Sequence, residues 1–371
     1  MRREEFFFRD GLAALKPYVP GKPAEEVRRE MGLTGRIVKL ASNENPVGPS
    51  PRAVARMKEV LEEVNQYPDS GCFELREALS RKYLLPPDCF VFGNGVDNLI
   101  PLVVNTFVNY GDEVIVPVPS FAAYRTSAVV AGAVPVEVPL RDFRIDTDLI
   151  YKAVGPRTRI IFICNPNNPT GTIVPGEELD RLLAALPPGV VAVLDEAYYE
   201  YVNDASYPDS LKYLKEDRNV VILRTFSKIY GLAGLRLGYG MTRPDFVRQM
   251  DKIREPFAAN RVVQAGAIEA LADAEFVSRV RALNLEGREI LYKGFEKLDI
   301  FYLPTEANFV FADLGADMDL LFPELLKRGV IVRPAGMWGY PTFARITTGT
   351  PEECRFFLER LEDALNFLKK S

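Results

Sequence analysis

The sequence predicts an α/β protein in which a mostly parallel sheet carries helices on both faces and a smaller α+β domain follows. Three observations support this fold class. Short runs that are apolar and β-branched throughout recur along the chain, helical stretches lie between them, and the pattern changes beyond about residue 265. Strands that are apolar throughout are typical of parallel sheets, because both of their faces are covered.

The first two thirds of the chain alternate strands and helices. A helix is expected over residues 51–64, where apolar residues recur on one side, and another over residues 177–186. Buried strands are expected over residues 89–92, 113–117, 159–164, 190–194 and 219–223. Strands joined through helices in this way form a parallel sheet with right-handed crossover connections.

The last third predicts a smaller domain. A long helical stretch is followed by a C-terminal helix and, before it, by short strands expected over residues 308–312, 330–333 and 344–347. The charged, proline-punctuated N-terminal segment is an arm that we expect to join this domain. The expected units are therefore an arm, a large cofactor-binding domain and a small domain, over residues 1–45, 46–260 and 261–371.

The chain of 371 residues contains no histidine. This excludes Ser-His-Asp and Cys-His nucleophile systems, histidine-ligated zinc or haem, and any acid–base step on imidazole. Proton transfer near neutral pH then falls to lysine, tyrosine, cysteine, a carboxylate or a cofactor.

Charge and cysteine spacing narrow the expected partners further. The net charge of −5 argues against nucleic acid or an anionic membrane as a partner. The four cysteines are scattered without a CxxC pair, so neither a metal site nor a disulfide framework is expected. The N-terminus lacks an apolar run long enough for a secretory leader, and we expect a cytoplasmic protein.

Polar residues follow the predicted strands at the point where each strand ends. NPNNPTG occupies residues 165–171, DEAY residues 195–198, RTFSK residues 224–228, and GNGVDN residues 93–98, with Arg236 a little further on. Ligands bind beyond the carboxyl ends of strands in open parallel sheets. A carboxylate, a phenol, a lysine, two hydroxyls and an arginine are therefore expected to converge on one edge.

This set of side chains suits pyridoxal 5′-phosphate (PLP). The aldehyde of PLP needs a lysine amine, its ring nitrogen needs a carboxylate, and its phosphate needs backbone N–H groups, hydroxyls and a cation. Each motif alone has a simpler explanation. Asp195 could cap a helix, NPNNPTG could be a cluster of turns, and GNGVDN lacks the third glycine of a dinucleotide-binding loop. Their joint occurrence at successive strand ends favours the cofactor site.

The order of NPNNPTG, LDEAY, RTFSK and GLAGLRLG resembles fold-type-I PLP-dependent aminotransferases. Within this class the chain is similar to the histidinol-phosphate aminotransferase family, and the resemblance covers nearly the whole chain. The motifs that carry the narrower likeness are KPYVPGKP at 16–23, LASNENPVGPS at 40–50, NQYPD at 65–69, VRP at 332–334 and ARITTGTPEE at 344–353.

The resemblance implies roles in cofactor binding. Lys228 would hold PLP as a Schiff base and later carry a proton, and Asp195 would keep the ring nitrogen protonated. The other implied contacts are Tyr198 and Asn168 to the ring hydroxyl, Phe121 to the ring face, and to the phosphate the backbone of Val96 and Asp97 with Thr225, Ser227 and Arg236. Tyr67 would reach the phosphate of a neighbouring subunit, which implies a homodimer.

The resemblance also implies a substrate site for a small amino donor and a 2-oxo acid. Arg345 would bind a carboxylate through two parallel hydrogen bonds, with Asn168 beside it. Tyr18 and Arg333 would lie toward the distal end, where Arg333 could pair with a phosphate. Simpler roles are an ion pair at the surface or between subunits for Arg333 and plain packing for Tyr18.

Two positions depart from the family pattern. Asn98 stands where an acidic residue is common, and we expect no consequence because the phosphate contact there is made by backbone. Phe121 replaces a frequent tyrosine, so it keeps the aromatic face but lacks a hydroxyl for the substrate.

The expected reaction is transfer of the amino group of histidinol phosphate to 2-oxoglutarate, giving imidazole-acetol phosphate and glutamate. An aromatic-amino-acid aminotransferase shares nearly all of these motifs, and a threonine-phosphate decarboxylase shares the scaffold. A nucleotide-binding oxidoreductase would leave LDEAY and TFSK without a role. A non-catalytic PLP-binding regulator is disfavoured because all the expected reactive groups are present.

Overall fold

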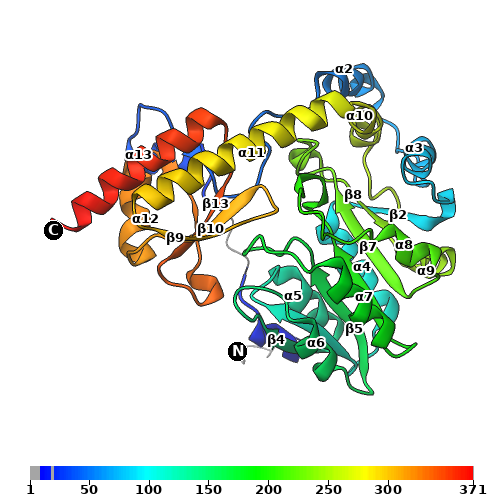
Figure 1. The fold of residues 1–371 in the computed structure, drawn as a ribbon. Coiled ribbons are helices and arrows are strands. Elements are labelled where there is room, and N and C mark those ends of the chain that lie inside the picture. Colours follow the sequence, from blue (N-terminus) through cyan, green and yellow to red (C-terminus); the bar gives the residue numbers. More distant parts are fainter. Residues whose placement is uncertain (1–8, 18–20, 371) are drawn as a thin grey trace, which may run out of the picture.

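The computed structural model describes residues 9–17 and 21–370, so Tyr18 lies outside the described residues. Its largest element is a seven-stranded sheet at the centre of the larger part of the molecule (Figure 1). In spatial order the strands are β2 (Phe90–Gly93), β8 (Gly238–Met241), β7 (Val220–Thr225), β6 (Val191–Asp195), β5 (Thr158–Cys164), β3 (Glu113–Val118) and β4 (Val134–Pro139). The predicted mostly parallel sheet is confirmed.

Strand β8 is antiparallel to both of its neighbours, β2 and β7, whereas the remaining pairs are parallel. The sequence did not predict β8 or β4. β8 has the sequence GYGM, and two glycines weaken any strand signal. β4 has the sequence VPVEVP and is largely open to solvent at the edge of the sheet, the position where prolines are tolerated in strands.

Helices cover both faces of this sheet (Figure 1). One face packs against α4 (Val96–Phe107), α5 (Ala122–Ala131) and α9 (Pro244–Met250). The opposite face packs against α3 (Phe73–Tyr83), α6 (Thr147–Ala153), α7 (Gly176–Ala185), α8 (Leu211–Lys215) and α10 (Arg261–Ala272). The apolar strands predicted from the sequence are buried because both faces are covered.

The smaller part contains a four-stranded antiparallel sheet. Its spatial order is β12 (Arg333–Pro334), β13 (Phe343–Thr347), β10 (Phe309–Asp313) and β9 (Phe301–Leu303). Three helices surround it, α11 (Ala274–Lys297), α12 (Met318–Lys327) and α13 (Pro351–Leu368). The predicted strand over residues 330–333 is two short strands, β12 and β11 (Val330–Ile331).

The N-terminal segment divides between the two parts: η1 (Asp10–Ala14) lies against α5 on the larger part, and residues 24–40 pack against the smaller part. It contains α1 (Ala24–Met31), and β1 (Val38–Lys39) pairs in parallel with β11. The chain then crosses to α2 (Pro51–Glu59), which packs against α10 on the larger part. Helix α11 runs from the larger to the smaller part (Figure 1).

The exact domain boundaries at residues 45 and 260 stay a prediction. Among the described residues, no helix combines the length and the apolar composition needed to cross a bilayer.

Candidate active site

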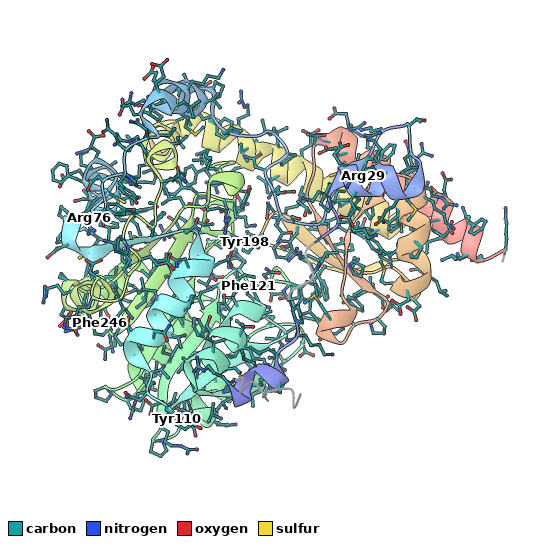
Figure 2. The ribbon with its side chains drawn as sticks, turned by 180° about the vertical axis from the view of Figure 1, so that it is seen from behind. Arg29, Arg76, Tyr110, Phe121, Tyr198 and Phe246 are labelled. Atoms are coloured by element: carbon teal, nitrogen blue, oxygen red, sulfur yellow. The ribbon has the colours of Figure 1, made fainter. Side chains whose placement is uncertain are left out.

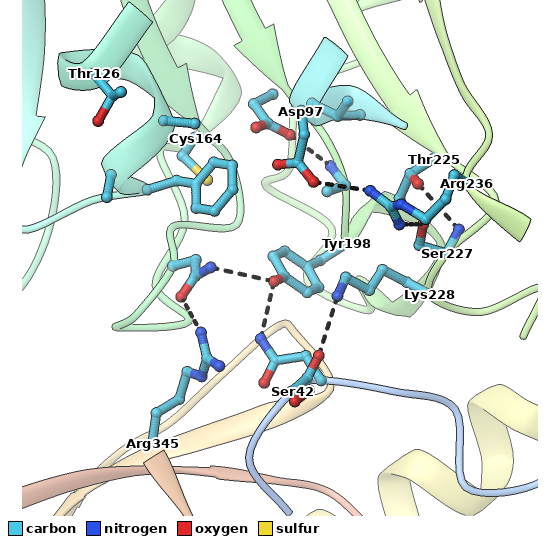
Figure 3. A pocket seen from close by; sticks show the side chains of 18 residues that line it. Ser42, Asp97, Thr126, Cys164, Tyr198, Thr225, Ser227, Lys228, Arg236 and Arg345 are labelled. Carbon is cyan, nitrogen blue, oxygen red and sulfur yellow. Dashed lines mark hydrogen bonds and ion pairs between the residues drawn. The ribbon is translucent and has the colours of Figure 1, made fainter. Parts of the chain in front are cut away.

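A cavity of about 480 Å³ opens at the carboxyl ends of β5, β6 and β7, facing the smaller part (Figure 3). In Figure 2, Phe121 and Tyr198 lie in the middle of the molecule, whereas Tyr110 and Phe246 lie at its edge. The predicted residues that line the cavity are Val96, Asp97, Phe121, Asn168, Asp195, Tyr198, Thr225, Ser227, Lys228, Arg236 and Arg345. The topology therefore brings together residues that are up to about 250 positions apart in the sequence.

Lys228 follows β7 and projects into this cavity (Figure 3). Its Nζ donates a hydrogen bond of 3.4 Å to the carbonyl oxygen of Ser42. Burial, and to a lesser extent the nearby positive charge of Arg345, lower the pKa of Lys228 to about 8. A lysine with this pKa has an appreciable neutral fraction near neutral pH, which makes it a nucleophile and a proton carrier.

Asp195 ends β6 at the floor of the cavity. Its Oδ2 accepts a hydrogen bond of 2.6 Å from the hydroxyl of Tyr124, and its Oδ1 accepts one of 3.1 Å from the backbone N–H of Ala197. Burial raises the pKa of Asp195 to about 6, while the Tyr124 hydrogen bond acts in the opposite direction. A buried carboxylate of this kind is stabilised by a cation placed beside it.

Tyr124 was missed by the sequence analysis. It lies on α5, is fully buried, and stacks on Phe162 at 4.4 Å between ring centroids. Phe121, at the start of the same helix, meets the ring of Tyr124 edge-on at 5.7 Å. An aromatic residue inside a helix carries no motif, so only its spacing of one helical turn from Phe121 could have indicated it.

A hydrogen-bond network joins Tyr198 to both parts of the molecule (Figure 3). Asn43 and Asn168 donate side-chain hydrogen bonds of 2.9 and 3.4 Å to the Tyr198 hydroxyl. Arg345, on β13, donates from Nη1 to Asn168 at 2.7 Å and from Nη2 to the carbonyl oxygen of Ala41 at 2.8 Å. Asn43 lies in the LASNENP motif, but the sequence analysis gave it no role.

The N-terminus of α4 forms the corner predicted for a phosphate. Gly95 precedes the helix with φ of +81°, and a Cβ there would lie 2.5 Å from Nη2 of Arg236. Arg236 pairs with Asp97 at 2.8 Å and donates to the Ser227 hydroxyl at 3.3 Å. The N–H groups of Val96 and Asp97 at the helix start, together with a guanidinium, are suited to bind an anion.

Two other predicted residues do not line the cavity. The side chain of Tyr67 is 78% exposed and stacks on Phe257 with ring centroids 4.5 Å apart. Arg333 is buried on β12, directly opposite Arg345 on β13, and approaches the sulfur of Met337. Tyr18, as noted, is not among the described residues. The roles of these three residues stay predictions.

The residues of the cavity fit PLP. Lys228 offers an amine of lowered pKa, and buried Asp195 offers a carboxylate for a protonated ring nitrogen. Because Gly95 has no side chain, Arg236 lies against the start of α4, and a phosphate would bind there beside Arg236, Ser227 and Thr225. The fold and this site define a PLP-dependent enzyme.

The chain belongs to the class I and II aminotransferase family, whose pattern matches residues 35–361. It is 47% identical over 358 residues to the histidinol-phosphate aminotransferase of Moorella thermoacetica, which covers 96% of this chain and 92% of that protein. It is 46% identical over 357 residues to the enzyme of that name from Symbiobacterium thermophilum, with 96% of this chain and 98% of that protein covered.

A solved structure shows the same architecture. The histidinol-phosphate aminotransferase of Sinorhizobium meliloti, in complex with PLP, superposes with a TM-score of 0.88 at 28% identity, covering 97% of this chain and 98% of that one. The predicted fold class, enzyme class and cofactor are thereby confirmed. The individual residue roles rest on the geometry described above.

We predict that Tyr124→Phe weakens PLP binding at slightly acidic pH. The hydroxyl of Tyr124 lowers the pKa of Asp195, so its loss raises that pKa above about 6 and protonates the carboxyl at higher pH. A hydrogen bond to a charged group contributes about 1.5–3 kcal/mol, which corresponds to a loss of about tenfold or more in affinity near pH 6.5. Titration of the protein with PLP between pH 5.5 and 8 measures the effect. Tyr110→Phe is the control, since Tyr110 is 93% exposed, and an unchanged profile for Tyr124→Phe contradicts the prediction.

We also predict that Gly238→Ala weakens PLP binding through the phosphate corner. A Cβ at Gly238 would lie 2.7 Å from the carbonyl carbon of Gly95 and from the nitrogen of Val96, so the start of α4 must shift. A misplaced anion site costs about 10-fold to 100-fold in affinity or rate. Gly234→Ala is the matched control, because a Cβ there meets nothing within 4 Å. Equal PLP dissociation constants for the two variants would contradict the prediction.

Proposed function

We propose that this aminotransferase transfers the amino group of histidinol phosphate to 2-oxoglutarate, giving imidazole-acetol phosphate and glutamate. The observation that carries the proposal is the likeness over nearly the whole chain to relatives of that name. Two buried arginines that face each other across β12 and β13 support it, because the substrates carry a phosphate and carboxylates.

Lys228 is the residue that we assign to covalent and proton-transfer chemistry. When bound, PLP supplies an electron sink for negative charge at the substrate α-carbon. Lys228 would hold the cofactor through its amine, and the same amine, when free, would take the proton from the substrate α-carbon and deliver a proton to the carbon that was the aldehyde of PLP. Its lowered pKa suits both tasks, because the amine has to be neutral to act as a base.

Asp195, Tyr198 and Asn168 are assigned to orienting the cofactor. Asp195 would hold a proton on the ring nitrogen by its negative charge, and Tyr124 and Ala197 keep that carboxylate in place. Two side-chain amides donate to the hydroxyl of Tyr198 and fix its position. The Tyr198 hydroxyl would then bond to the ring hydroxyl of PLP.

Arg345 is assigned to the substrate carboxylate. Its Nη1 and Nη2 are directed at Asn168 and the carbonyl oxygen of Ala41, which fixes the plane of the guanidinium at the cavity wall. Arg333, one strand away, is assigned to the distal phosphate, and Tyr18 is expected near the same end. Phe121 has no hydroxyl, so the substrate makes no hydrogen bond at this position.

We propose that the active unit is a homodimer, in which Tyr67 reaches the phosphate corner of a second copy. Tyr67 lies outside the cavity of its own chain and is 78% exposed. Further large apolar side chains are exposed on neighbouring segments, namely Leu61, Val64, Phe73, Ile253 and Phe257. Exposed apolar side chains near Tyr67 favour contact with a second chain. The cytoplasmic location inferred from the sequence stays a prediction.

We predict that Lys228→Ala abolishes turnover together with the visible absorption of lysine-bound PLP. Among the described residues that line the cavity, Lys228 is the one lysine, so the loss of rate should reach about 10⁴-fold or more. Stopped assays and absorption spectra of the purified protein measure both. Lys215→Ala, at an exposed position on α8, is the control and should keep both. Survival of turnover and absorption in Lys228→Ala refutes the assignment.

The substrate assignment predicts a clear order of amino donors. The value of kcat/KM for histidinol phosphate should exceed those for phenylalanine and tyrosine by about 100-fold or more, because charged groups in a site reject donors that leave them unpaired. A side-by-side kinetic comparison with 2-oxoglutarate as acceptor tests this, with threonine phosphate included to detect decarboxylation. A preference for phenylalanine would overturn the substrate while leaving the PLP chemistry in place.

A further inference from the structure

A buried ion pair lies next to the cofactor site without touching it. Arg224 on β7 immediately precedes Thr225, and Glu196 immediately follows Asp195 at the end of β6. Nη2 and Nε of Arg224 bond to one carboxylate oxygen of Glu196 at 2.7 and 2.9 Å. The two side chains are only 2% and 1% exposed. Neither of them lines the cavity.

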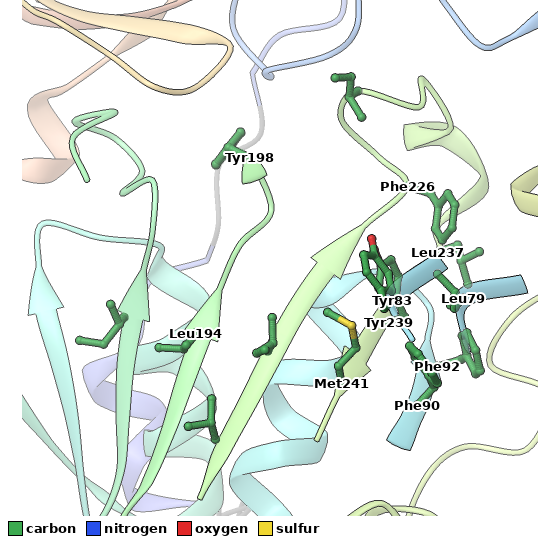
Figure 4. Close-up of a cluster of buried hydrophobic side chains, with 14 of the residues drawn as sticks. Leu79, Tyr83, Phe90, Phe92, Leu194, Tyr198, Phe226, Leu237, Tyr239 and Met241 are labelled. Atoms are coloured by element: carbon green, nitrogen blue, oxygen red, sulfur yellow. The ribbon is translucent and has the colours of Figure 1, made fainter. Parts of the chain in front are cut away.

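Aromatic rings enclose the guanidinium of Arg224. It lies 3.5 Å from the ring centroid of Tyr199 and 5.0 Å from that of Tyr83, whose hydroxyl bonds to that of Tyr239 at 2.7 Å. Figure 4 shows Tyr83 and Tyr239 among the apolar side chains packed beside this end of the sheet. The second carboxylate oxygen of Glu196 accepts a hydrogen bond from Ser210. The pair is thus held in one arrangement by packing and by hydrogen bonds.

Stability alone is a weak reason for such a pair. Removing two charges from water costs several kcal/mol per ion, and apolar residues of similar size often serve the fold equally well. The position of the pair suggests a different role. The backbone ladder between β6 and β7 ends with the bond of 2.8 Å from the N–H of Glu196 to the carbonyl oxygen of Leu223. The side chains of Glu196 and Arg224 continue the connection where the backbones separate.

The strand ends that the pair joins carry the reactive groups. Asp195 lies one residue before Glu196, and Thr225, Ser227 and Lys228 follow Arg224. Neighbouring residues on a strand point to opposite faces, so the pair fixes these ends from the side away from the cavity. The negative charge of Glu196 also acts on Asp195, and Arg224 compensates it at 2.7 Å.

We propose that Arg224 and Glu196 are positioning residues, which fix the spacing of the ends of β6 and β7 and set the charge that Asp195 experiences beside the cofactor. This inference rests on the proposed role of Asp195 at the ring nitrogen. It goes beyond that role because the charge around Asp195 is set by the pair of Arg224 and Glu196, which lies on the other face of the sheet.

Other titratable groups also face Asp195. They are Tyr124 from α5, Cys164 from β5 and Asp97 from α4, the last of which is paired with Arg236. Burial raises the pKa of Asp195 most, and the charges of Asp97 and Glu196 act in the same direction. The test therefore changes only Glu196 and Arg224 and leaves these three groups in place.

The two single variants should shift the pH dependence of PLP binding in opposite directions. Glu196→Gln removes a negative charge near Asp195 and leaves Arg224 uncompensated, so the midpoint below which PLP is lost should fall by about 0.5–1 pH unit. Arg224→Met leaves Glu196 uncompensated, so that midpoint should rise by about as much. Release of PLP on dilution of the holoenzyme, followed by visible absorption between pH 5 and 8, measures both. Loosening of the fold would instead shift both variants in the same direction.

A double variant and a distant ion pair complete the experiment. Arg224→Met with Glu196→Met removes both charges of the pair, and the nearby buried carboxyl of Glu200, whose pKa burial raises to about 7, then loses the charge of Arg224 that lowers it and becomes neutral. The double variant should therefore fold and return the midpoint toward that of the wild type, with PLP binding still weakened about tenfold by lost positioning. Arg288→Met is the control, since it breaks the pair of Arg288 with Glu306 at 3.3 Å outside the cavity and should change stability but not PLP release.

Several outcomes overturn the inference. They are midpoints that do not move, midpoints that move in the same direction in both single variants, and a double variant that binds PLP as the wild type does. If a single variant fails to fold, Arg224→Lys keeps the charge but loses the two-pronged contact, and wild-type PLP binding by it would equally contradict the positioning role. Failure of the proposed function is distinguishable, because a wrong substrate shows in the comparison of amino donors by the wild-type protein, and a wrong cofactor assignment shows as a wild-type protein without the visible absorption.

Discussion

The site depends on one constraint, which is the burial of a carboxylate at the end of β6. Asp195 is 3% exposed, and its charge is opposed by the loss of water around it. Tyr124 and the backbone of Ala197 offset part of this cost, but each supplies a dipole and not a full charge. Under the proposed function, a cationic ring nitrogen would offset the rest. The fold thus creates a position that a protonated pyridine ring fills well, and the lysine, the hydroxyls and the start of α4 are arranged around that position.

Much of this could be predicted from the sequence because parallel strands end at one edge. Asp195, Thr225 and Lys228 each follow a buried apolar run, so finding the strands also located the residues that come after them. The prediction failed where a residue enters the site by another route. Tyr124 reaches Asp195 from the middle of a helix, and Asn43 reaches Tyr198 from an irregular segment. The sequence pattern around Tyr124 and Asn43 does not indicate which residues they contact in the folded protein.

Tertiary packing also explains why the sequence did not predict β8 and did not place Arg333 relative to Arg345. The sequence did not predict β8 because glycine is needed where its backbone lies close to the start of α4. A Cβ at Gly238 would overlap the start of that helix. A residue that is chosen for the absence of a side chain gives no strand signal. Arg333 and Arg345 were both found as candidates, but only the antiparallel pairing of β12 and β13 places them opposite each other.

A chain without histidine has to obtain its acid–base chemistry from another group, and the surroundings of Lys228 show how a lysine is suited to supply it. A lysine in water is almost entirely protonated at neutral pH, so it is a poor base. Burial beside β7 and the positive charge of Arg345 lower its pKa to about 8. Arg345 favours the neutral form of Lys228, and under the proposed function its guanidinium would also bind the substrate carboxylate. A carboxylate that binds Arg345 will partly cancel this effect, so substrate binding and the protonation of Lys228 are coupled through a single guanidinium.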